Sequence, residues 1–288
     1  MSEFPRTMVG GISMPRLICG SNWLLGYSHM TQAKDRMLKE MFDTPSKIAK
    51  VIEVFARAGC NAFMSMATEF IAQALKEVEQ RVGVPMIWIT TPGYVNPTNI
   101  DNSFDANATS DTWKLAADHA KSLGGTFCFP HESVTNPRVD RVNKCLTPDL
   151  MNHLRYVREI GMIPGLSTHM PDAIICADLC GADVESYVQP YNSMGFLCQY
   201  ETDWVLRIIN GAKKPVMVIK PMAGGRLMPA TGLPFVWNTI RDCDMVTIGT
   251  MSTYEAEEVI EMSLACLERR RAEVELQFTR SKRHLIND

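Results

Sequence analysis

Side chains that could carry protons or bind metal ions follow several apolar segments of this sequence, namely His29, Glu69, His131, His169 and Lys220. Imidazole rings exchange protons near neutral pH, and together with a carboxylate they form ligand sets for divalent metal ions. A lysine withdrawn from water can act as a base or a nucleophile, whereas a charged lysine stabilises an anionic or enolate oxygen. These residue types favour acid–base chemistry, with or without a metal.

The fold must bring these side chains together, because they lie far apart in the sequence. The segment 215–229, PVMVIKPMAGGRLMP, indicates how this is done. Its residues 216–219 form an unbroken apolar run, which is typical of a strand buried on both faces of a parallel sheet. Lys220 and then a glycine pair follow the run directly. A charge at the carboxyl end of a buried strand is typical of the catalytic face of a (β/α)8 barrel.

The rest of the chain repeats the alternation of strand and helix that a barrel requires. Helical segments carry apolar residues at core spacing and end at glycines. Segment 95–110 is polar, without periodicity, and is expected to be a surface loop. The expected strands are 17–19, 60–65, 85–90, 126–129, 163–166, 186–188, 216–219 and 245–248, and the expected helices are 46–59, 70–81, 111–122, 148–160, 171–179, 203–209 and 254–271. We therefore predict an α/β protein with a single (β/α)8 TIM-barrel domain over residues 1–288.

Composition excludes several other classes of protein. The chain has 288 residues, 46% hydrophobic and 21% charged, with a formal net charge of −3. It has no basic stripe, so a nucleic-acid partner is not expected. No apolar run approaches the roughly 20 residues of a membrane span, and no signal pattern begins the chain. Nine scattered cysteines argue against a disulfide framework. We expect a cytoplasmic protein that acts on a small molecule, and homo-oligomer formation is left open.

The candidate catalytic residues are His131, Lys220 and Glu69. His131 would be the acid or base, and Lys220 would stabilise an oxyanion. The candidate metal ligands are His29, His169 and Glu132, which would hold Mn, Zn or Co. The alternative for each histidine is a hydrogen-bonded residue in the wall of the barrel.

Two further groups of residues follow the predicted strands. The candidates for binding substrate are Asn22, Trp23, Gln189, Tyr191 and Asn192. The alternative for the aromatic residues among them is ordinary packing at the rim of the barrel. The second group lies where barrels commonly bind phosphate. The alternative is that its glycines only form turns, which requires no ligand. This candidate cofactor-binding group comprises Gly224, Gly225, Arg226 and Thr250.

The order of these segments resembles the aldo/keto reductase superfamily. The resemblance is carried by LICGSNW, AGCNAF, FCFPH, GLSTH, QPYN, IKPMAGGRL and TIGTMST, and it covers most of the chain. It implies that His131 is the active-site histidine and that Gln189 and Asn192 lie beside a nicotinamide. It also implies that the turns after Lys220 and Gly249 hold the phosphate end of that cofactor, NADP.

Three of the four catalytic positions of that family are replaced in this chain. The family's Asp and Tyr after the second strand are absent from Phe63-Met64-Ser65-Met66-Ala67-Thr68-Glu69, and Thr90-Thr91 stands where the family has a lysine. The segments GYSH, GLSTH and IKPMAGG resemble a branch of reductase-like barrels that handles sugars or keto-sugars.

We therefore expect a non-redox lyase or isomerase that acts on a small sugar or other carbonyl compound by acid–base chemistry, with a divalent metal as an option. The first alternative is an NAD(P)H-dependent reductase whose proton donor is His131, Tyr94 or Tyr191. The second alternative is a barrel that binds a ligand without catalysis.

Overall fold

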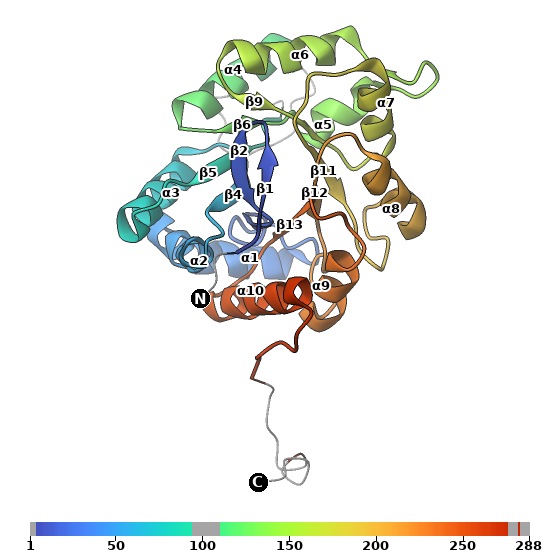
Figure 1. Ribbon diagram of the computed structural model, residues 1–288. Coiled ribbons are helices and arrows are strands. Elements are labelled where there is room, and N and C mark those ends of the chain that lie inside the picture. The colour runs from blue at the N-terminus through green and yellow to red at the C-terminus, as the bar shows by residue number, and fades with distance from the viewer. Residues whose placement is uncertain (1–3, 94–109, 276–281, 283–288) are drawn as a thin grey trace.

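The computed structural model describes residues 4–93, 110–275 and 282, and residues 110 and 111 only in their backbone. Parallel strands lie at the centre, and helices surround them (Figure 1). The strands of the sheet are β3 (Leu17–Gly20), β4 (Ala62–Ser65), β5 (Ile87–Thr90), β6 (Phe127–Cys128), β9 (Ile163–Pro164), β10 (Leu166–Ser167), β11 (Tyr187–Pro190), β12 (Val216–Ile219) and β13 (Met245–Ile248).

The sheet closes on itself at Gly165. The strand order is β10-β11-β12-β13-β3-β4-β5-β6-β9, so the two ends of the sheet are β9 and β10. These two strands are consecutive in the chain and are separated by Gly165 alone. They are the two halves of the strand expected at 163–166, and counting them as one leaves an eight-stranded barrel. The predicted fold class is confirmed.

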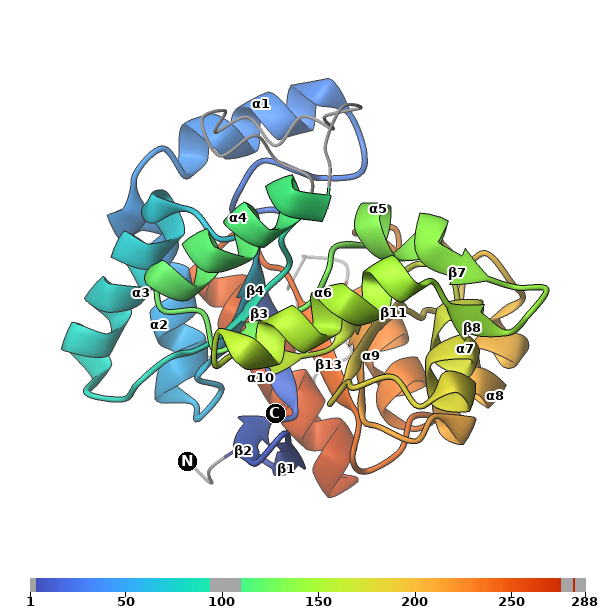
Figure 2. The same ribbon diagram turned by 90° about the horizontal axis from the view of Figure 1, so that it is seen from above.

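Helices cover the outside of the barrel, as the top view shows (Figure 2). Helix α2 illustrates the cause, because Ile48, Ile52 and Phe55 recur at helical spacing and are fully buried against the sheet. The helices are α1 (Gln32–Met41), α2 (Pro45–Arg57), α3 (Glu69–Val82), α4 (Ser110–Ser122), α5 (Glu132–Thr135), α6 (Pro148–Glu159), α7 (Asp172–Cys180), α8 (Thr202–Gly211), α9 (Pro229–Trp237) and α10 (Thr253–Glu268), with a 3₁₀ turn at Asn136–Arg138.

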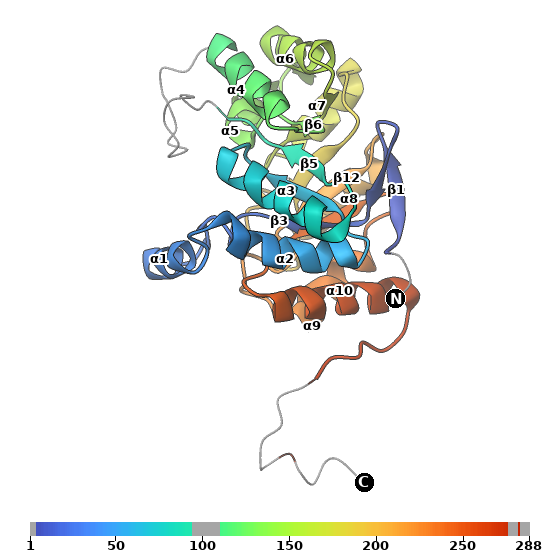
Figure 3. The same cartoon turned by 90° about the vertical axis from the view of Figure 1, so that its left-hand side faces the viewer.

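The structure contains elements that the sequence patterns did not predict. An antiparallel hairpin, β1 (Arg6–Val9) and β2 (Ile12–Pro15), turns at Gly10 and Gly11, which both have positive φ. Val9 and Met14 of this hairpin pack into the interior of the barrel, at the side away from α1 (Figure 3). Helix α9 was missed because Gly232 and Pro234 lie inside it, and both residue types disfavour helices.

A second hairpin, β7 (Val139–Asp140) and β8 (Cys145–Leu146), was also not predicted. Most of the expected surface loop 95–110 lies outside the described residues. No helix in the part of the chain that the structure describes is long and apolar enough to cross a membrane.

Asp244 joins two neighbouring strands at the end of the barrel opposite the strand C-termini. Its carboxylate is fully buried and accepts hydrogen bonds from Val216 N at 2.8 Å and from Arg241 Nη2 at 2.7 Å. We expect Asp244→Ala to lower the free energy of unfolding by about 3 kcal/mol, because it leaves a buried N–H and a guanidinium without their acceptor. Urea unfolding measures this effect. Asp242→Ala is the control, since Asp242 is fully exposed, and an equal loss in both variants would contradict the assignment.

Candidate functional site

A cavity of about 390 Å³ opens at the carboxyl ends of the strands. Its size is that of a small-molecule site. The residues come from the ends of most strands and from the loops that follow them, which is where barrels place catalytic groups. They include Ser21, Asn22, Trp23, Tyr27, His29, Ser65, Thr91, His131, Glu132, Ser167, His169, Lys220, Gly224, Gly225, Thr247 and Gly249.

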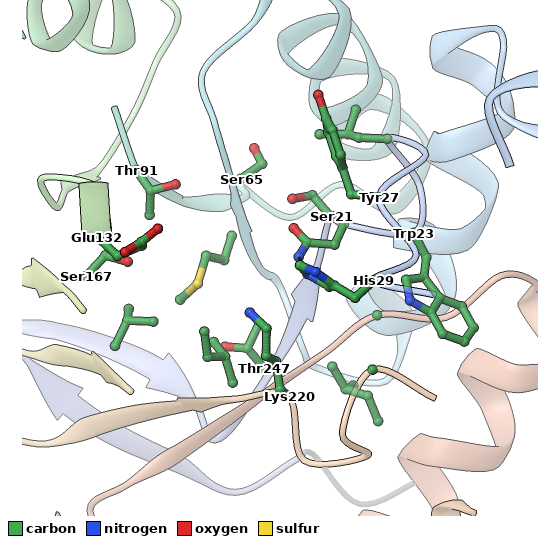
Figure 4. Close-up of a pocket in the computed structure, with 18 of the residues that line it drawn as sticks. Ser21, Trp23, Tyr27, His29, Ser65, Thr91, Glu132, Ser167, Lys220 and Thr247 are labelled. Carbon is green, nitrogen blue, oxygen red and sulfur yellow. Dashed lines mark hydrogen bonds between the residues drawn. The ribbon is translucent and has the colours of Figure 1, made fainter. Parts of the chain in front are cut away.

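Lys220 lies at the centre of this site in a strained backbone conformation. Strand β12 ends at Ile219, and Lys220 has φ of 59°. Residues other than glycine rarely adopt this left-handed conformation, and the following Pro221 restricts the backbone further. A hydrogen bond of 2.9 Å from Ala223 N to Lys220 O holds the turn. Lys220, His29 and Glu132 enter the cavity from three different segments (Figure 4).

The ammonium of Lys220 interacts with charged and titratable groups on several elements. Its Nζ lies 3.5 Å from His169 Nε2. Burial lowers the pKa of Lys220 to about 8, against the opposing effects of Glu132 and Cys198. Burial also raises the pKa of Glu132, while Lys220 lowers it. The lysine is therefore mostly protonated at neutral pH, yet it releases its proton more readily than an exposed lysine does.

The three histidines around Lys220 are neutral at physiological pH. Burial, and then the positive charge of Lys220, lower the pKa of His131 to about 4 and that of His169 to about 3. The same two causes lower the pKa of His29, with Arg226 adding to them. One cation thus stands among uncharged imidazole rings.

Hydrogen bonds determine which nitrogen of these rings carries the proton. The backbone N–H of Ser133 donates to His131 Nδ1 at 3.3 Å, so the proton of neutral His131 is on Nε2. His131 precedes the short helix α5, and its backbone N–H donates to Pro92 O. An ammonium can only donate, so His169 Nε2 is the acceptor for Lys220 and its proton is on Nδ1. His131 therefore offers an N–H to the cavity.

The expected metal ligands do not form a ligand group. Among the described residues, no group of three or more His, Cys, Asp or Glu side chains is arranged to hold a metal ion. Glu132 Oε2 accepts from Asn136 at 2.8 Å, and His29 Nε2 pairs with Asn22 Nδ2 at 2.9 Å. The ammonium of Lys220 provides the positive charge between these groups. The expectation that His29, His169 and Glu132 bind Mn, Zn or Co is corrected accordingly.

Glu69, expected to be catalytic, is not part of the cavity lining. It is exposed in the first turn of α3, where its charge suits the helix dipole. His131 and Lys220, the other two catalytic candidates, both line the cavity.

The candidate substrate-binding residues divide into two groups. Asn22 and Trp23 line the cavity, whereas Gln189, Tyr191 and Asn192 are fully buried and do not. The Tyr191 hydroxyl donates to Thr239 at 3.0 Å, and the Asn192 amide is bonded to both backbone groups of Phe196. Tyr191 therefore packs towards α9, and its phenol is no proton donor for this cavity. Tyr94, the other phenol considered, lies outside the described residues.

Of the four candidate cofactor-binding residues, two line the cavity and two, Arg226 and Thr250, do not. Gly224 and Gly225 line it, and a Cβ on Gly225 would lie 2.7 Å from Trp23 Cζ2, so the indole packs directly on this glycine. The Arg226 guanidinium stacks 4.1 Å from the Phe196 ring centroid and donates to His29 O at 2.8 Å. Thr250 is almost fully buried, and its hydroxyl has no hydrogen-bond partner among the described residues.

Small hydroxyl side chains of the cavity were not recognised in the sequence. Ser65 ends β4, Ser167 ends β10, and Thr247 lies in β13. Ser65 also accepts a hydrogen bond from Trp88 Nε1 at 2.9 Å. A polar residue at the carboxyl end of an apolar strand is the sequence pattern that could have identified them.

Solved structures with a similar fold include several aldo-keto reductases. PA4992 from Pseudomonas aeruginosa, provisionally assigned as an aldo-keto reductase, has a TM-score of 0.64 and 13% identity over 93% of this chain and 99% of its own. The aldo-keto reductase AKR11C1 from Bacillus halodurans, in its holo form, has a TM-score of 0.63 and 12% identity over 96% and 99%. A ribulose-1,5-bisphosphate carboxylase/oxygenase from Pyrococcus horikoshii has a lower TM-score of 0.53 and 10% identity, covering 79% of this chain and 57% of its own.

No protein-family model and no curated protein matches the sequence. The chain has the fold of an aldo/keto reductase-like barrel, with 12–13% sequence identity to these two structures. This similarity corrects the expectation of a non-redox lyase or isomerase, because the similar barrels with the higher TM-scores are aldo-keto reductases. The loss of the reductase phenol had favoured the wrong class of enzyme.

Proposed function

We propose that this aldo/keto reductase-like barrel is an NADP(H)-dependent oxidoreductase that interconverts a carbonyl group and an alcohol on a small molecule. The observation that carries the proposal is the pairing of two donors in one cavity of a reductase-like barrel. These donors are the His131 imidazole, protonated at Nε2, and the Lys220 ammonium. Two donors suit a carbonyl oxygen, which accepts two hydrogen bonds.

Features at the rim of the cavity fit a nicotinamide dinucleotide. Thr247 lines the cavity, and its buried hydroxyl has no hydrogen-bond partner among the described residues. The buried hydroxyl of Thr250, which does not line the cavity but follows the lining residue Gly249, also has none there. Gly249 lines the cavity, and a Cβ added there would meet no atom closer than Gly20 O at 3.7 Å. Polar atoms awaiting a partner beside open space are expected where a polar ligand binds. When bound, a reduced nicotinamide supplies the hydride.

Cations, and not a helix terminus, would hold the cofactor phosphates. The N-terminus of α10 is already capped by its own side chains, because Ser252 Oγ accepts from Glu255 N and Glu255 Oε2 accepts from Met251 N. Arg226 has no carboxylate partner within the described residues. Lys34 Nζ lies 4.4 Å from the Trp23 ring centroid. These two cations flank Trp23 and Gly225 and would pair with phosphate.

The polar side chains of the cavity would orient the substrate. His131 Nε2–H would donate to the carbonyl oxygen, and Ser133 keeps the ring in the required tautomer. Lys220 would add positive charge at the same oxygen. No group in this arrangement requires a metal ion to neutralise the developing charge.

The test of the proposed function is to mix purified protein with NADPH and, separately, NADH, and to follow quenching of tryptophan fluorescence. Consumption of the reduced cofactor is then followed with 4-nitrobenzaldehyde and with glyceraldehyde. Saturable quenching and carbonyl-dependent oxidation are the expected results. A protein that binds neither cofactor contradicts the proposal and favours the non-catalytic ligand-binding barrel.

We expect Arg226→Gln to weaken NADPH binding about 10-fold, because a charge-assisted phosphate contact contributes roughly 1.4 kcal/mol or more. The dissociation constant from the fluorescence titration measures this effect. Arg207→Gln is the matched control, since Arg207 is exposed on α8 and contacts Trp204. Equal affinity of the two variants would remove Arg226 from the proposed phosphate site.

A further inference from the structure

The missing reductase phenol leaves open which group gives a proton to the substrate oxygen. Tyr27 is the tyrosine that lines the cavity within the described residues. Its hydroxyl points away from Lys220 and Glu132 (Figure 4). His29 Nε2 is already paired with Asn22. Among the nitrogen donors that line the cavity within the described residues, the choice is therefore between His131 and Lys220.

The neutral His131 ring is a poor acid. Its pKa of about 4 describes loss of a proton from the imidazolium, which is hardly populated at neutral pH. Giving up the Nε2 proton of the neutral ring would create an imidazolate anion in a buried position. His131 can therefore hold a carbonyl oxygen through its N–H without transferring that proton.

Lys220 has the geometry of a proton donor. Its side chain lines the cavity, and its Nζ is held 3.5 Å from His169 Nε2. The backbone keeps this lysine at φ of 59°, a conformation that glycine would adopt without strain. Strained residues of this kind occur at functional sites, where the surrounding structure maintains them.

We propose that Lys220 is the catalytic acid of the carbonyl reduction, in the role that a phenol has in aldo/keto reductases. This assignment rests on the proposed function. A bound reduced nicotinamide would supply a hydride to the carbonyl carbon, and the π-electron pair of the C=O bond would move to the oxygen. That oxygen bonds to a proton of Nζ as the Nζ–H bond breaks. The carbonyl would thus be reduced to an alcohol at the expense of the nicotinamide, which would be oxidised, and Lys220 would become a neutral amine that takes up a proton from water.

The environment of Lys220 suits this step. The groups that face it are Glu132 from α5, Cys198 from the loop after β11, and the rings of His29, His131 and His169. A donor with a pKa near the working pH is both protonated and able to release its proton. The pKa of Lys220, about 8, meets this condition. Because the ammonium is the active form, kcat falls as the pH rises through about 8.

The first test compares Lys220→Met, Lys220→Arg and Tyr27→Phe with the wild-type protein, with Lys50→Met as the control for an exposed lysine on α2. We expect kcat to fall at least 100-fold in both Lys220 variants. Arginine keeps the positive charge but does not release a proton at accessible pH. Substantial activity in Lys220→Arg would overturn the proton-donor role, and so would a comparable loss in Tyr27→Phe. Melting temperatures check that the variants are folded.

The second test does not depend on enzyme activity. Lysines are labelled with acetic anhydride at a series of pH values, and the extent of labelling at Lys220 is measured by mass spectrometry. Half-maximal labelling is expected near pH 8, against about 10.4 for an ordinary lysine in a reference peptide. A Lys220 that labels like the reference peptide overturns the assignment. Wild-type protein that reduces no carbonyl overturns the proposed function, whereas reduction that persists in Lys220→Met overturns only the assignment of Lys220.

Discussion

Replacing His131 by alanine is expected to lower kcat/KM for carbonyl reduction by up to about 10³-fold, the effect of removing a donor to a developing oxyanion. His131 lines the cavity, and the Ser133 N–H donates to its Nδ1, which leaves the Nε2 proton for the substrate oxygen. Initial rates with NADPH and 4-nitrobenzaldehyde measure this effect. The pKa of His131 is about 4. Titration of this ring should therefore not change the wild-type rate of carbonyl reduction between about pH 6 and 7.

His119→Ala is the matched control for that experiment. His119 is exposed near the C-terminus of α4 and is not part of the cavity lining. His131→Gln keeps an N–H donor and should recover part of the rate, whereas His131→Phe should not. If His131→Ala and His119→Ala have the same activity, then His131 does not contact the reacting oxygen.

Replacing Gly165 by valine is expected to prevent the barrel from closing. A Cβ at this position would lie 2.3 Å from Phe129 Cε1 and 2.6 Å from Ser186 O. Phe129 packs edge-to-face against Phe127 inside the barrel, and its backbone N–H donates to Thr90 O, so neither neighbour moves freely. Overpacking costs about 1–3 kcal/mol or more, and here a backbone atom is also displaced. We expect little soluble protein, or a melting temperature lowered by more than about 8 °C.

The control for the barrel closure is Gly211→Ala. Gly211 is the last residue of α8, and a Cβ there would meet nothing within 4 Å. Alanine at a helical position should leave stability unchanged or raise it slightly. The melting temperature of the milder variant Gly165→Ala should lie between those of Gly165→Val and Gly211→Ala. If Gly165→Val melts at the same temperature as the wild-type protein, the sheet does not depend on this close contact. Because Phe129 is two residues before His131, a folded Gly165→Ala variant should also lose activity.

The sequence alone determined the alternation of elements. Apolar runs such as 216–219 and helical spacing such as Ile48, Ile52 and Phe55 are local patterns, and the structure has the strands and helices within a few residues of the expected bounds. The sequence also predicted that Lys220 lies at the catalytic rim of the barrel. The carboxyl ends of all strands in a parallel barrel lie at the same rim, and Lys220 follows a buried strand directly. Local periodicity was sufficient for these conclusions.

Only the tertiary structure decided which strand-end residues share the cavity. Gln189, Tyr191 and Asn192 follow the same pattern as His131, yet Tyr191 packs towards Thr239 and Asn192 holds the turn at Phe196. The direction of a side chain after a strand depends on the turn that follows, and the sequence does not specify that turn. Within the described residues, the expected metal ligands are not arranged as a ligand group, for a related reason. Three imidazoles and a carboxylate attract a cation, and the ammonium of Lys220, brought in from a distant segment, supplies that charge.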